Sequence, residues 1–386
     1  MRNPMPINLD ILKWARISLG LSVSEVAKRM KKRKSEIEDW ESGISFPTYS
    51  QLEKLAYEVY KRPIALFFFP EIPEEDTPKT EFRTLPDTLI EDLPVEIIKV
   101  YRKAKVYQLY LAELYDNSKP VSTNLIDKYS IRNRNDVFSI ASDIRINLGI
   151  SIEEQYAWDN FDTAFKKWRI ALEEKGIFVF KDAFKNDDFS GFCVYDKKYP
   201  IIFINNSMPY SRQIFTLFHE LGHLLYHMGG VDFRDNRHID FTSRKYSIYE
   251  VTCNKFANEF LVPTDVFKKQ DLTVSENNIS FLAGQFSVSR DVILRNLLDL
   301  GLIDSNKYDK MVSTWAHEYE QKKINKEQKK KKGGHYYYTQ ITYLGSTYIN
   351  LAFSKYYQNK ITPENLSSYL NIKESKISTF EHYAFG

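Results

Sequence analysis

The sequence predicts a multidomain protein that is predominantly α-helical, with an α+β core in its middle and an all-α domain at its N-terminus. Two observations lead to this fold class. The chain has 386 residues, more than one hydrophobic core usually organises. Apolar residues recur at helical spacing over residues 9–60, whereas runs typical of strands occur at 176–180, 190–195 and 200–204. Separate helical and mixed domains are therefore expected.

Composition narrows the class of protein further. Hydrophobic residues make up 43% of the chain and charged residues 27%, which is ordinary for a folded soluble protein. A net charge of +3 is too small to indicate nucleic-acid binding by itself. There are only two cysteines, no signal-peptide pattern, and no apolar run near the ~18 to 20 residues that span a bilayer. We expect a reduced, cytoplasmic protein with no membrane partner.

The N-terminal segment predicts short helices joined by a tight basic turn. Ser22 and Glu25 form a capping box, and Gly43 suits a helix end. Six of the seven residues from Lys28 to Lys34 are basic. This pattern has two interpretations: a DNA-binding surface, or the solvated face of a protein-interaction module, of which we favour the first.

Through Glu25-Val26-Ala27, and through Trp40-Glu41-Ser42-Gly43 followed by Pro47, about 60 residues resemble the helix-turn-helix domain of Xre-family regulators. The resemblance implies that one helix enters the major groove of a double-stranded operator and that the protein forms a homodimer. The residues expected at the bases are Lys32, Arg33, Lys34 and Ser35.

A proline-rich acidic stretch at 70–78 marks the first domain boundary. The predicted domains are a helix-turn-helix domain at 1–75, a helical linking region at 76–160, a catalytic-type α+β domain at 161–315, a lysine-rich linker at 316–334 and a small C-terminal accessory domain at 335–386.

The motif His219-Glu220-Leu-Gly-His223 lies within a segment of helical periodicity. Histidines four residues apart share a helix face, so both imidazoles can bind one Zn²⁺ ion while Glu220 lies beside it as a general base. Chance could place two histidines at this spacing. We favour the metal site, because four of the seven histidines in the chain lie within twenty residues: His219, His223, His227 and His238.

A catalytic zinc site normally takes a third protein ligand. His227, if it continues the same helix, lies about 12 Å along the axis from His219, too far to converge easily. Glu250 and Glu259 lie nine residues apart on a second helix, on opposite faces, so only one of them can point at the metal. We choose Glu250 because Cys253 and Ala257 on its face are small. The alternative for Glu250 is an exposed carboxylate at a helix start.

Further motifs surround these residues: Arg212-Gln213 precedes the His219 motif, and Glu250 is followed by Asn254-Lys-Phe-Ala257 and Leu261-Val-Pro263. Through these motifs, residues 160 to 315 resemble the ImmA/IrrE family of zinc metallopeptidases. Residues 279–303 resemble the helix-turn-helix-like segment that follows the core in that family.

The resemblance implies regulated proteolysis of a repressor, linked to stress response or mobile-element transfer. Fused relatives also look like antitoxins encoded beside a toxin, so the protein substrate could be a repressor or a neighbouring-gene toxin. The alternative function is a non-catalytic zinc-containing regulator or antitoxin that binds DNA and protein.

Candidates for stabilising an oxyanion are His227, His238, Tyr226 and Tyr246, and His227 has an equally good interpretation as a structural histidine.

Overall fold

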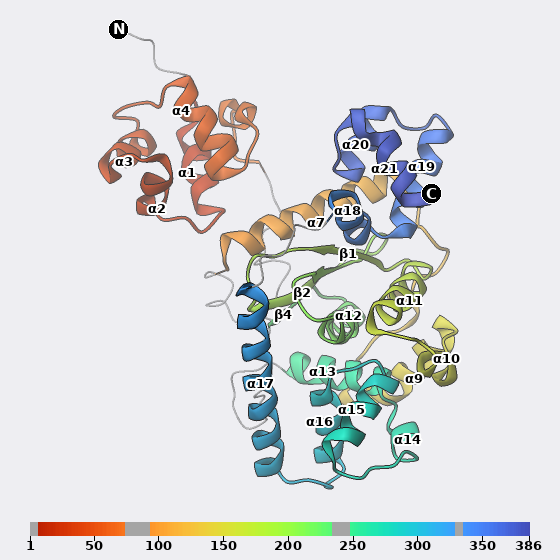
Figure 1. Cartoon of the computed structure of the whole chain (residues 1–386). Helices are drawn as coiled ribbons and strands as arrows, with labels where there is room; N and C mark the ends of the chain where they lie inside the picture. Colours follow the sequence, from red (N-terminus) through yellow and green to blue (C-terminus); the bar gives the residue numbers. More distant parts are fainter. Residues whose placement is uncertain (1–6, 74–92, 234–247, 329–334) are drawn as a thin grey trace. The chain divides into compact units, whose positions relative to one another are not determined.

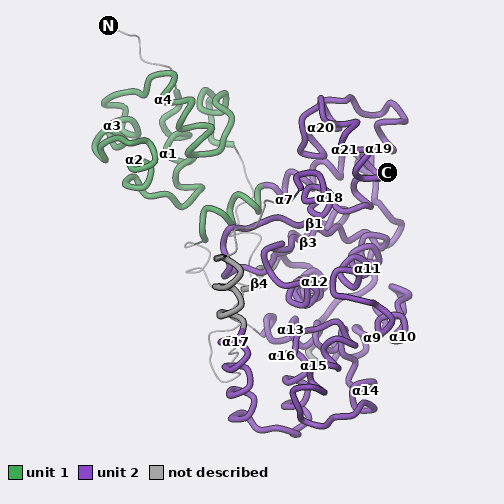
Figure 2. Tube along the Cα trace, viewed as in Figure 1, with its two compact units in different colours: residues 1–102 green, residues 103–386 purple. Residues whose placement is uncertain are grey.

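The computed structural model describes residues 7–73, 93–233, 248–328 and 335–386 (Figure 1). The chain forms two compact units, Met1–Arg102 and Lys103–Gly386, and the boundary between them falls within helix α7 (Figure 2). Helices dominate both units. The predicted fold class, multidomain and mainly α with an N-terminal helix-turn-helix domain, is confirmed. No helix among the described residues is both long and apolar enough to cross a membrane.

Unit 1 is all-helical. Its elements are α1 Leu9–Ile17, α2 Val23–Met30, α3 Lys34–Ser42, α4 Tyr49–Lys54, the π-helical turn η1 Leu55–Tyr60, the 3₁₀ turn η2 Ile64–Phe68 and the first part of α7 Val95–Leu114. The expected capping box forms at the start of α2, where the Ser22 hydroxyl accepts from Glu25 N and the Glu25 side chain accepts from Ser22 N. Gly43 ends α3 in the left-handed conformation, at φ 77°.

Helices α1 and α3 of unit 1 are joined by an ion pair as well as by apolar packing. The guanidinium of Arg16 donates to both carboxylate oxygens of Glu41, at 2.6 and 2.8 Å. The neighbouring Trp40 and Ile37 are buried. In the Trp-Glu-Ser-Gly segment, Trp40 thus packs in the core, Glu41 forms the ion pair between the helices, and Gly43 ends α3.

Unit 2 is built on a four-stranded sheet of order β1-β3-β2-β4. The strands are β1 Phe178–Asp182, β2 Phe189–Val194, β3 Ile201–Asn205 and β4 Gly230–Phe233. β1 runs parallel to β3, while β2 runs antiparallel to both β3 and β4. Three of these strands were predicted. β4 was not, because a four-residue strand shows too few alternations to stand out in the sequence.

Both faces of the sheet are covered, which explains why nearly every residue of β1, β2 and β3 is buried. Helix α12 (Tyr210–Leu225) packs on one face. On the other, Tyr107 of α7 stacks on Phe180 with ring centroids 4.4 Å apart, and Tyr348 of α19 (Ser346–Tyr357) contacts Phe180 edge to face at 5.1 Å. Figure 1 shows the sheet between α12 and the layer formed by α7 and α18 (Tyr336–Leu344).

The remaining helices of unit 2 complete the scaffold. They are α8 Leu125–Lys128, η3 Arg134–Asp136, α9 Val137–Leu148, α10 Ile152–Tyr156, α11 Phe161–Glu173, α13 Ile248–Leu261, α14 Thr264–Phe267, α15 Glu276–Gln285, α16 Arg290–Asp299, α17 Ser305–Gln328, α20 Pro363–Leu370, η5 Glu374–Lys376 and α21 Ile377–Phe385.

Two expectations about domain organisation differ from what the structure contains. Residues 316–334 were expected as a linker, but helix α17 runs through Gln328, since no glycine or proline interrupts it before Gly333. Residues 335–386 were expected as a separate accessory domain, yet they belong to unit 2, and α18 packs against β1. Together with α7, they form the layer that covers the second face of the sheet.

Arg169 attaches this second layer to the rest of unit 2. Its side chain is 6% exposed and pairs with the buried Glu173 at 3.0 Å. It also donates to the carbonyls of Thr342 at 2.8 Å and Tyr343 at 3.3 Å, at the C-terminal end of α18, and to the carbonyl of Val179 in β1. A cation at this position satisfies carbonyls that have no partner within the helix.

Gly345 follows α18 at φ 81°, and a Cβ atom there would collide with the Arg169 guanidinium. We therefore expect Gly345→Ala to lower the free energy of unfolding of unit 2 by about 2–3 kcal/mol, from backbone strain plus the clash. Denaturant unfolding followed by circular dichroism measures this loss.

Gly301→Ala is the control. Gly301 also has positive φ, 71°, but a Cβ there meets nothing within 4 Å, so only a loss of about 1 kcal/mol is expected. Equal losses in the two variants would contradict the anchoring role of Arg169.

Candidate metal centre and DNA-binding helix

Helix α12 carries the two histidines of the predicted site on its buried side. It lies against the sheet, mainly against β2, and His219, Glu220 and His223 are all 0% exposed. A charged or polar side chain in such surroundings is costly unless it has partners. Three fully buried polar side chains close together on one helix therefore indicate a functional site.

Helix α13 brings the third residue, Glu250, to these histidines. The two helices approach closely at Gly222, where a Cβ atom would lie 3.0 Å from Cys253 Sγ and 3.2 Å from Cys253 Cα. The absence of a side chain at Gly222 and the small side chain of Cys253 permit this approach. Glu250 lies in the first turn of the same helix as Cys253, is 7% exposed, and faces α12.

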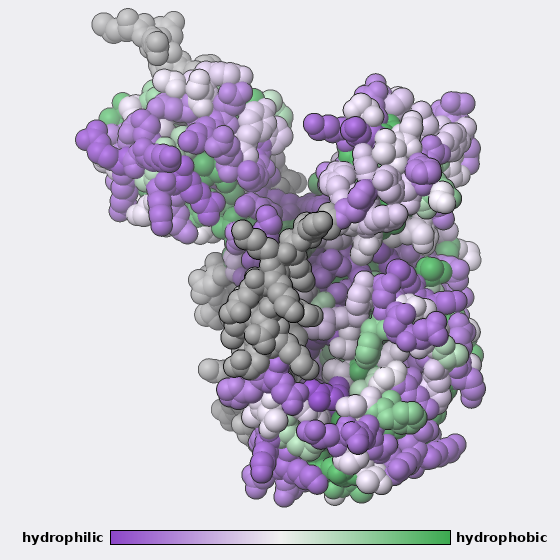
Figure 3. All heavy atoms as spheres, in the orientation of Figure 1, coloured by the Kyte–Doolittle hydropathy of each residue, from purple (hydrophilic) through white to green (hydrophobic). Residues whose placement is uncertain are grey.

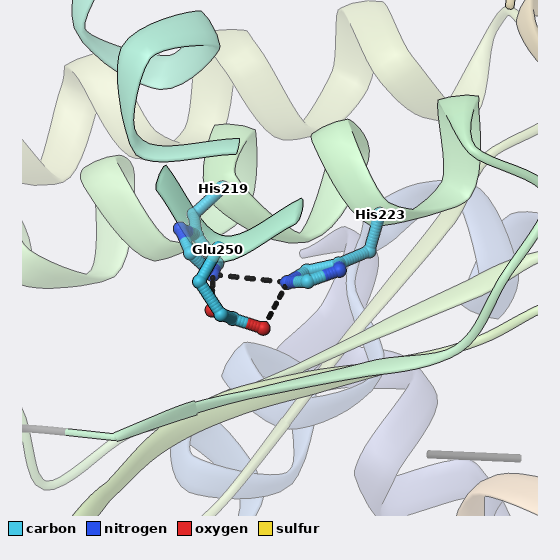
Figure 4. A group of neighbouring side chains, drawn as sticks. All are labelled: His219, His223 and Glu250. Carbon is cyan, nitrogen blue, oxygen red and sulfur yellow. Dashed lines mark hydrogen bonds and ion pairs between the residues drawn. The ribbon is translucent and has the colours of Figure 1, made fainter. Parts of the chain in front are cut away.

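The three side chains converge on one point (Figure 4). The Nε2 atoms of His219 and His223 are 3.1 Å apart. Glu250 Oε2 lies 3.3 Å from His219 Nε2, and Glu250 Oε1 lies 3.3 Å from His223 Nε2. Burial alone would raise the pKa of Glu250, but the two imidazoles outweigh it and hold that pKa below its usual value.

Asn254, one turn after Glu250, orients the first histidine. His219 Nδ1 and Asn254 Oδ1 are 2.9 Å apart. Because a carbonyl oxygen can only accept, Nδ1 carries the proton and donates it, and His219 Nε2 presents its lone pair to the centre. Asn254 did not enter the predicted site. Its position four residues after Glu250, on the same helix face, was the signal that could have identified it.

The donor set fits a zinc ion. Two imidazole nitrogens and one carboxylate oxygen are ligands that Zn²⁺ takes in catalytic sites. Ligands ~2.0–2.1 Å from a tetrahedral ion lie roughly 3.3 Å from one another, close to the 3.1 and 3.3 Å found among these atoms. An ion at the centre would also relieve the contact between two Nε2 atoms, of which at least one presents a lone pair.

Glu220 follows His219 directly in α12, and its carboxylate affects the pKa of Cys253 in α13. Burial raises the pKa of the Cys253 thiol, and the negative charges of Glu250 and Glu220 raise it further. Cys253 and Cys193 are both buried and neither forms a disulfide.

Among the described residues, the other candidates of the sequence prediction do not join this group. Helix α12 ends at Leu225, so His227 does not continue it: it is exposed, has φ 57°, and its Nε2 lies 3.0 Å from the carbonyl oxygen of Ile126. Tyr226 packs edge to face on Tyr249. Glu259 accepts from the backbone N and the hydroxyl of Thr264. His238 and Tyr246 lie outside the described residues.

Buried polar side chains from α9 and α10 fix the far end of α13. Arg145 donates to the carbonyl of Phe260 at 2.8 Å, and Gln155 donates to the carbonyl of Leu261 at 3.0 Å. These carbonyls end the helix and have no partner within it. The region predicted as a helical link at 76–160 therefore helps to position Glu250, a role that the sequence did not reveal.

In unit 1, the residues predicted to contact DNA lie at the start of α3. Arg33 is the N-cap residue, and Arg33, Lys34 and Ser35 are exposed. Lys32 pairs with Glu36 at 2.7 Å and Lys34 with Glu38 at 3.4 Å. Arg33 has no ion pair among the described residues. Of the three basic side chains, it presents the least neutralised charge.

Comparison with protein-family models places two domains in the chain. Residues 12–56 match the helix-turn-helix family, and residues 172–298 match a peptidase family described as the IrrE N-terminal-like domain. The first range includes α2 and α3, and the second includes His219, His223 and Glu250. The predicted fusion of these two domain types is confirmed. Searches of the curated proteins and of the solved structures give no match.

Since Asn254 orients His219, we expect Asn254→Leu to weaken zinc binding roughly ten- to a hundredfold, the usual effect of removing an outer partner of a histidine ligand. Competition with a chromogenic chelator measures the affinity. Asn254→Asp keeps an acceptor oxygen for His219 Nδ1 and should bind zinc nearly as tightly as the original protein. The orienting role is wrong if leucine and aspartate at this position give the same affinity.

Proposed function

We propose, from the joining of a helix-turn-helix domain to an IrrE N-terminal-like domain in one chain, that this protein is a DNA-binding transcriptional regulator with a zinc-dependent endopeptidase unit. Its substrate would be a regulatory protein, such as a repressor or the product of a neighbouring toxin gene. The observation that carries the proposal is the convergence of His219, His223 and Glu250 on one buried point. Glu220, which is also buried, follows His219 directly in α12.

In this proposal His219, His223 and Glu250 hold the zinc ion. When bound, zinc supplies Lewis acidity, which makes water more acidic and a carbonyl carbon more electrophilic. Glu220 removes a proton from the attacking water and gives it to the leaving amine, so that the peptide bond breaks as a carboxylate and an amine form. Asn254 keeps His219 in the tautomer that binds metal through Nε2.

The alternative is a non-catalytic regulator or antitoxin in which zinc only stabilises the fold. A structural zinc site is normally closed by four protein ligands, whereas only three converge here among the described residues, and a structural site has no need of a base beside its ligands. Glu220 is 0% exposed, and the burial of a carboxylate costs free energy. Its presence favours catalysis over a purely structural role.

DNA binding rests on the exposed start of α3. In helix-turn-helix domains the N-terminal residues of the recognition helix reach base edges in the major groove. Arg33, Lys34 and Ser35 occupy that position here. Homodimerisation, which such regulators commonly use, belongs to the same proposal.

Glu220→Gln tests the peptidase activity. The amide keeps the shape of the side chain but cannot accept a proton, so we expect about one zinc per chain and a cleavage rate lowered about 10²- to 10⁴-fold. Metal-dependent cleavage of the products of neighbouring genes, followed by gel electrophoresis and mass spectrometry, provides the measurement. His219→Ala is the matched control, and it should lose both zinc and cleavage.

A Glu220→Gln variant that keeps full function in cells would show that proteolysis is not the function. Absence of stoichiometric zinc from the original protein, or zinc that His219→Ala leaves unchanged, would remove the metal from both the proposal and its alternative.

Arg33→Ala tests DNA binding. Loss of a side chain that contacts a base or phosphate should lower affinity about tenfold, and binding of the original protein should weaken as salt increases. A DNA sequence selected by the protein from a random pool serves as the probe in a fluorescence-anisotropy titration. Lys13→Ala removes one exposed positive charge from α1 and is the control. If neither substitution changes affinity, α3 is a protein-docking surface instead.

A further inference from the structure

Unit 2 contains a cavity of about 990 Å³ that adjoins the metal centre. Its wall includes Asn254, the partner of His219, and Phe215, whose ring stacks on the His219 imidazole at 6.5 Å between centroids. From there the cavity extends along α13 to α15, α16 and α17. A molecule bound in it would lie beside the proposed site of hydrolysis.

Apolar side chains form much of the cavity wall. They include Phe138, Phe215, Phe267, Val292, Val312 and Trp315. Elsewhere the visible face of unit 2 is mainly hydrophilic, with hydrophobic residues in small patches (Figure 3). A cavity of this size and character suits bulky apolar groups.

The charged residues of the wall largely neutralise one another. Arg290 pairs with Glu318 at 3.2 Å and lies over the Trp315 ring at 4.5 Å. Arg295 pairs with Asp299 at 3.5 Å, and Asp291 accepts from the Tyr308 hydroxyl at 2.9 Å. Asn258 and Asn296 satisfy each other through two hydrogen bonds, of 3.0 and 2.8 Å. These pairings do not favour a strongly charged ligand.

Two buried donors of the wall, Asn254 Nδ2 and Trp315 Nε1, differ from this pattern, and the first belongs to the partner of His219. Asn254 Nδ2 is buried and has no hydrogen-bond partner among the described residues. Its other atom, Oδ1, is already engaged by His219. A buried amide without an acceptor costs free energy. A ligand that places a carbonyl oxygen at the junction of cavity and metal centre would supply the missing acceptor.

We propose that this cavity binds the segment of the substrate that flanks the cleaved bond, and that it selects bulky apolar side chains there. This inference rests on the proposed peptidase function. A peptide provides both the apolar side chains that match the wall and the backbone carbonyl that Asn254 lacks. Substrates are thereby chosen by apolar residues near the cleavage point, and only where the segment is locally unfolded and can enter.

Gly284 allows the cavity to be filled without disturbing its wall. It lies in α15, lines the cavity, and a Cβ atom there meets nothing within 4 Å. Gly284→Leu should therefore project into open space, and leucine also favours a helix more than glycine does. Asn277→Leu, at an exposed position of α15 outside the cavity, is the matched control. Ser280→Phe, on an exposed residue of the wall, is the second filling variant should Gly284→Leu not fold.

The zinc-loaded full chain is incubated with a synthetic mixture of dodecapeptides varied at every position, and the products are identified by mass spectrometry. We expect cleavage near bulky apolar residues. In Gly284→Leu, cleavage of those peptides should fall at least tenfold relative to peptides with small side chains, while zinc content and the Asn277→Leu control stay unchanged. An unchanged preference in a folded filling variant overturns the proposal.

A binding measurement separates this inference from the peptidase function. Immobilised Glu220→Gln protein should retain the apolar peptides of the same mixture. The double variant that carries both Glu220→Gln and Gly284→Leu should bind these peptides at least tenfold more weakly. If no form of the protein cleaves but this binding difference is found, the cavity is a peptide site and the peptidase function is wrong. If apolar peptides bind no better than polar ones, or bind both proteins equally, the cavity inference fails.

Discussion

The close contact between α12 and α13 is the constraint on which the candidate site depends. His219 and His223 come from one helix and Glu250 from the other, so their atoms meet at 3.3 Å only if the helix backbones nearly touch. Gly222 against Cys253 permits this distance. The sheet beneath α12, and the bonds from Arg145 and Gln155 to the end of α13, then hold both helices in place. A metal centre of three side chains thus requires most of unit 2.

Sequence reasoning succeeded where local patterns carry the information. The spacing of His219 and His223, the capping box of Ser22 and Glu25, and the small residues on the Glu250 face are all readable within one or two helical turns. They predicted both domain types, which the family comparison confirms, and the three residues that the structure brings together.

The remaining features depend on contacts between distant segments. By residue type Arg145 and Gln155 resemble surface residues, yet both are buried and bind the carbonyls that end α13. The sequence did not reveal this because those carbonyls lie more than a hundred residues away in the chain. Arg169 is similar, with partners at 342 and 343. The sequence spacing places Asn254 on the Glu250 face, but its hydrogen bond to His219 is seen only in the folded chain. His227 was expected within a helix, but its backbone turns to φ 57° after α12 ends.

The two layers on the sheet have a consequence for the synthesis of the protein. Helix α18 covers β1, and Tyr348 lies on Phe180, although about 160 residues separate these segments in the chain. During translation α7, the strands and α12 emerge well before α18 and α19, which complete the layer on the second face of the sheet. Unit 1 can fold early on its own core, whereas only α7 covers the second face of the sheet until residues 336–357 leave the ribosome. A nascent chain therefore acquires a folded helix-turn-helix domain while its candidate metal centre is still incomplete.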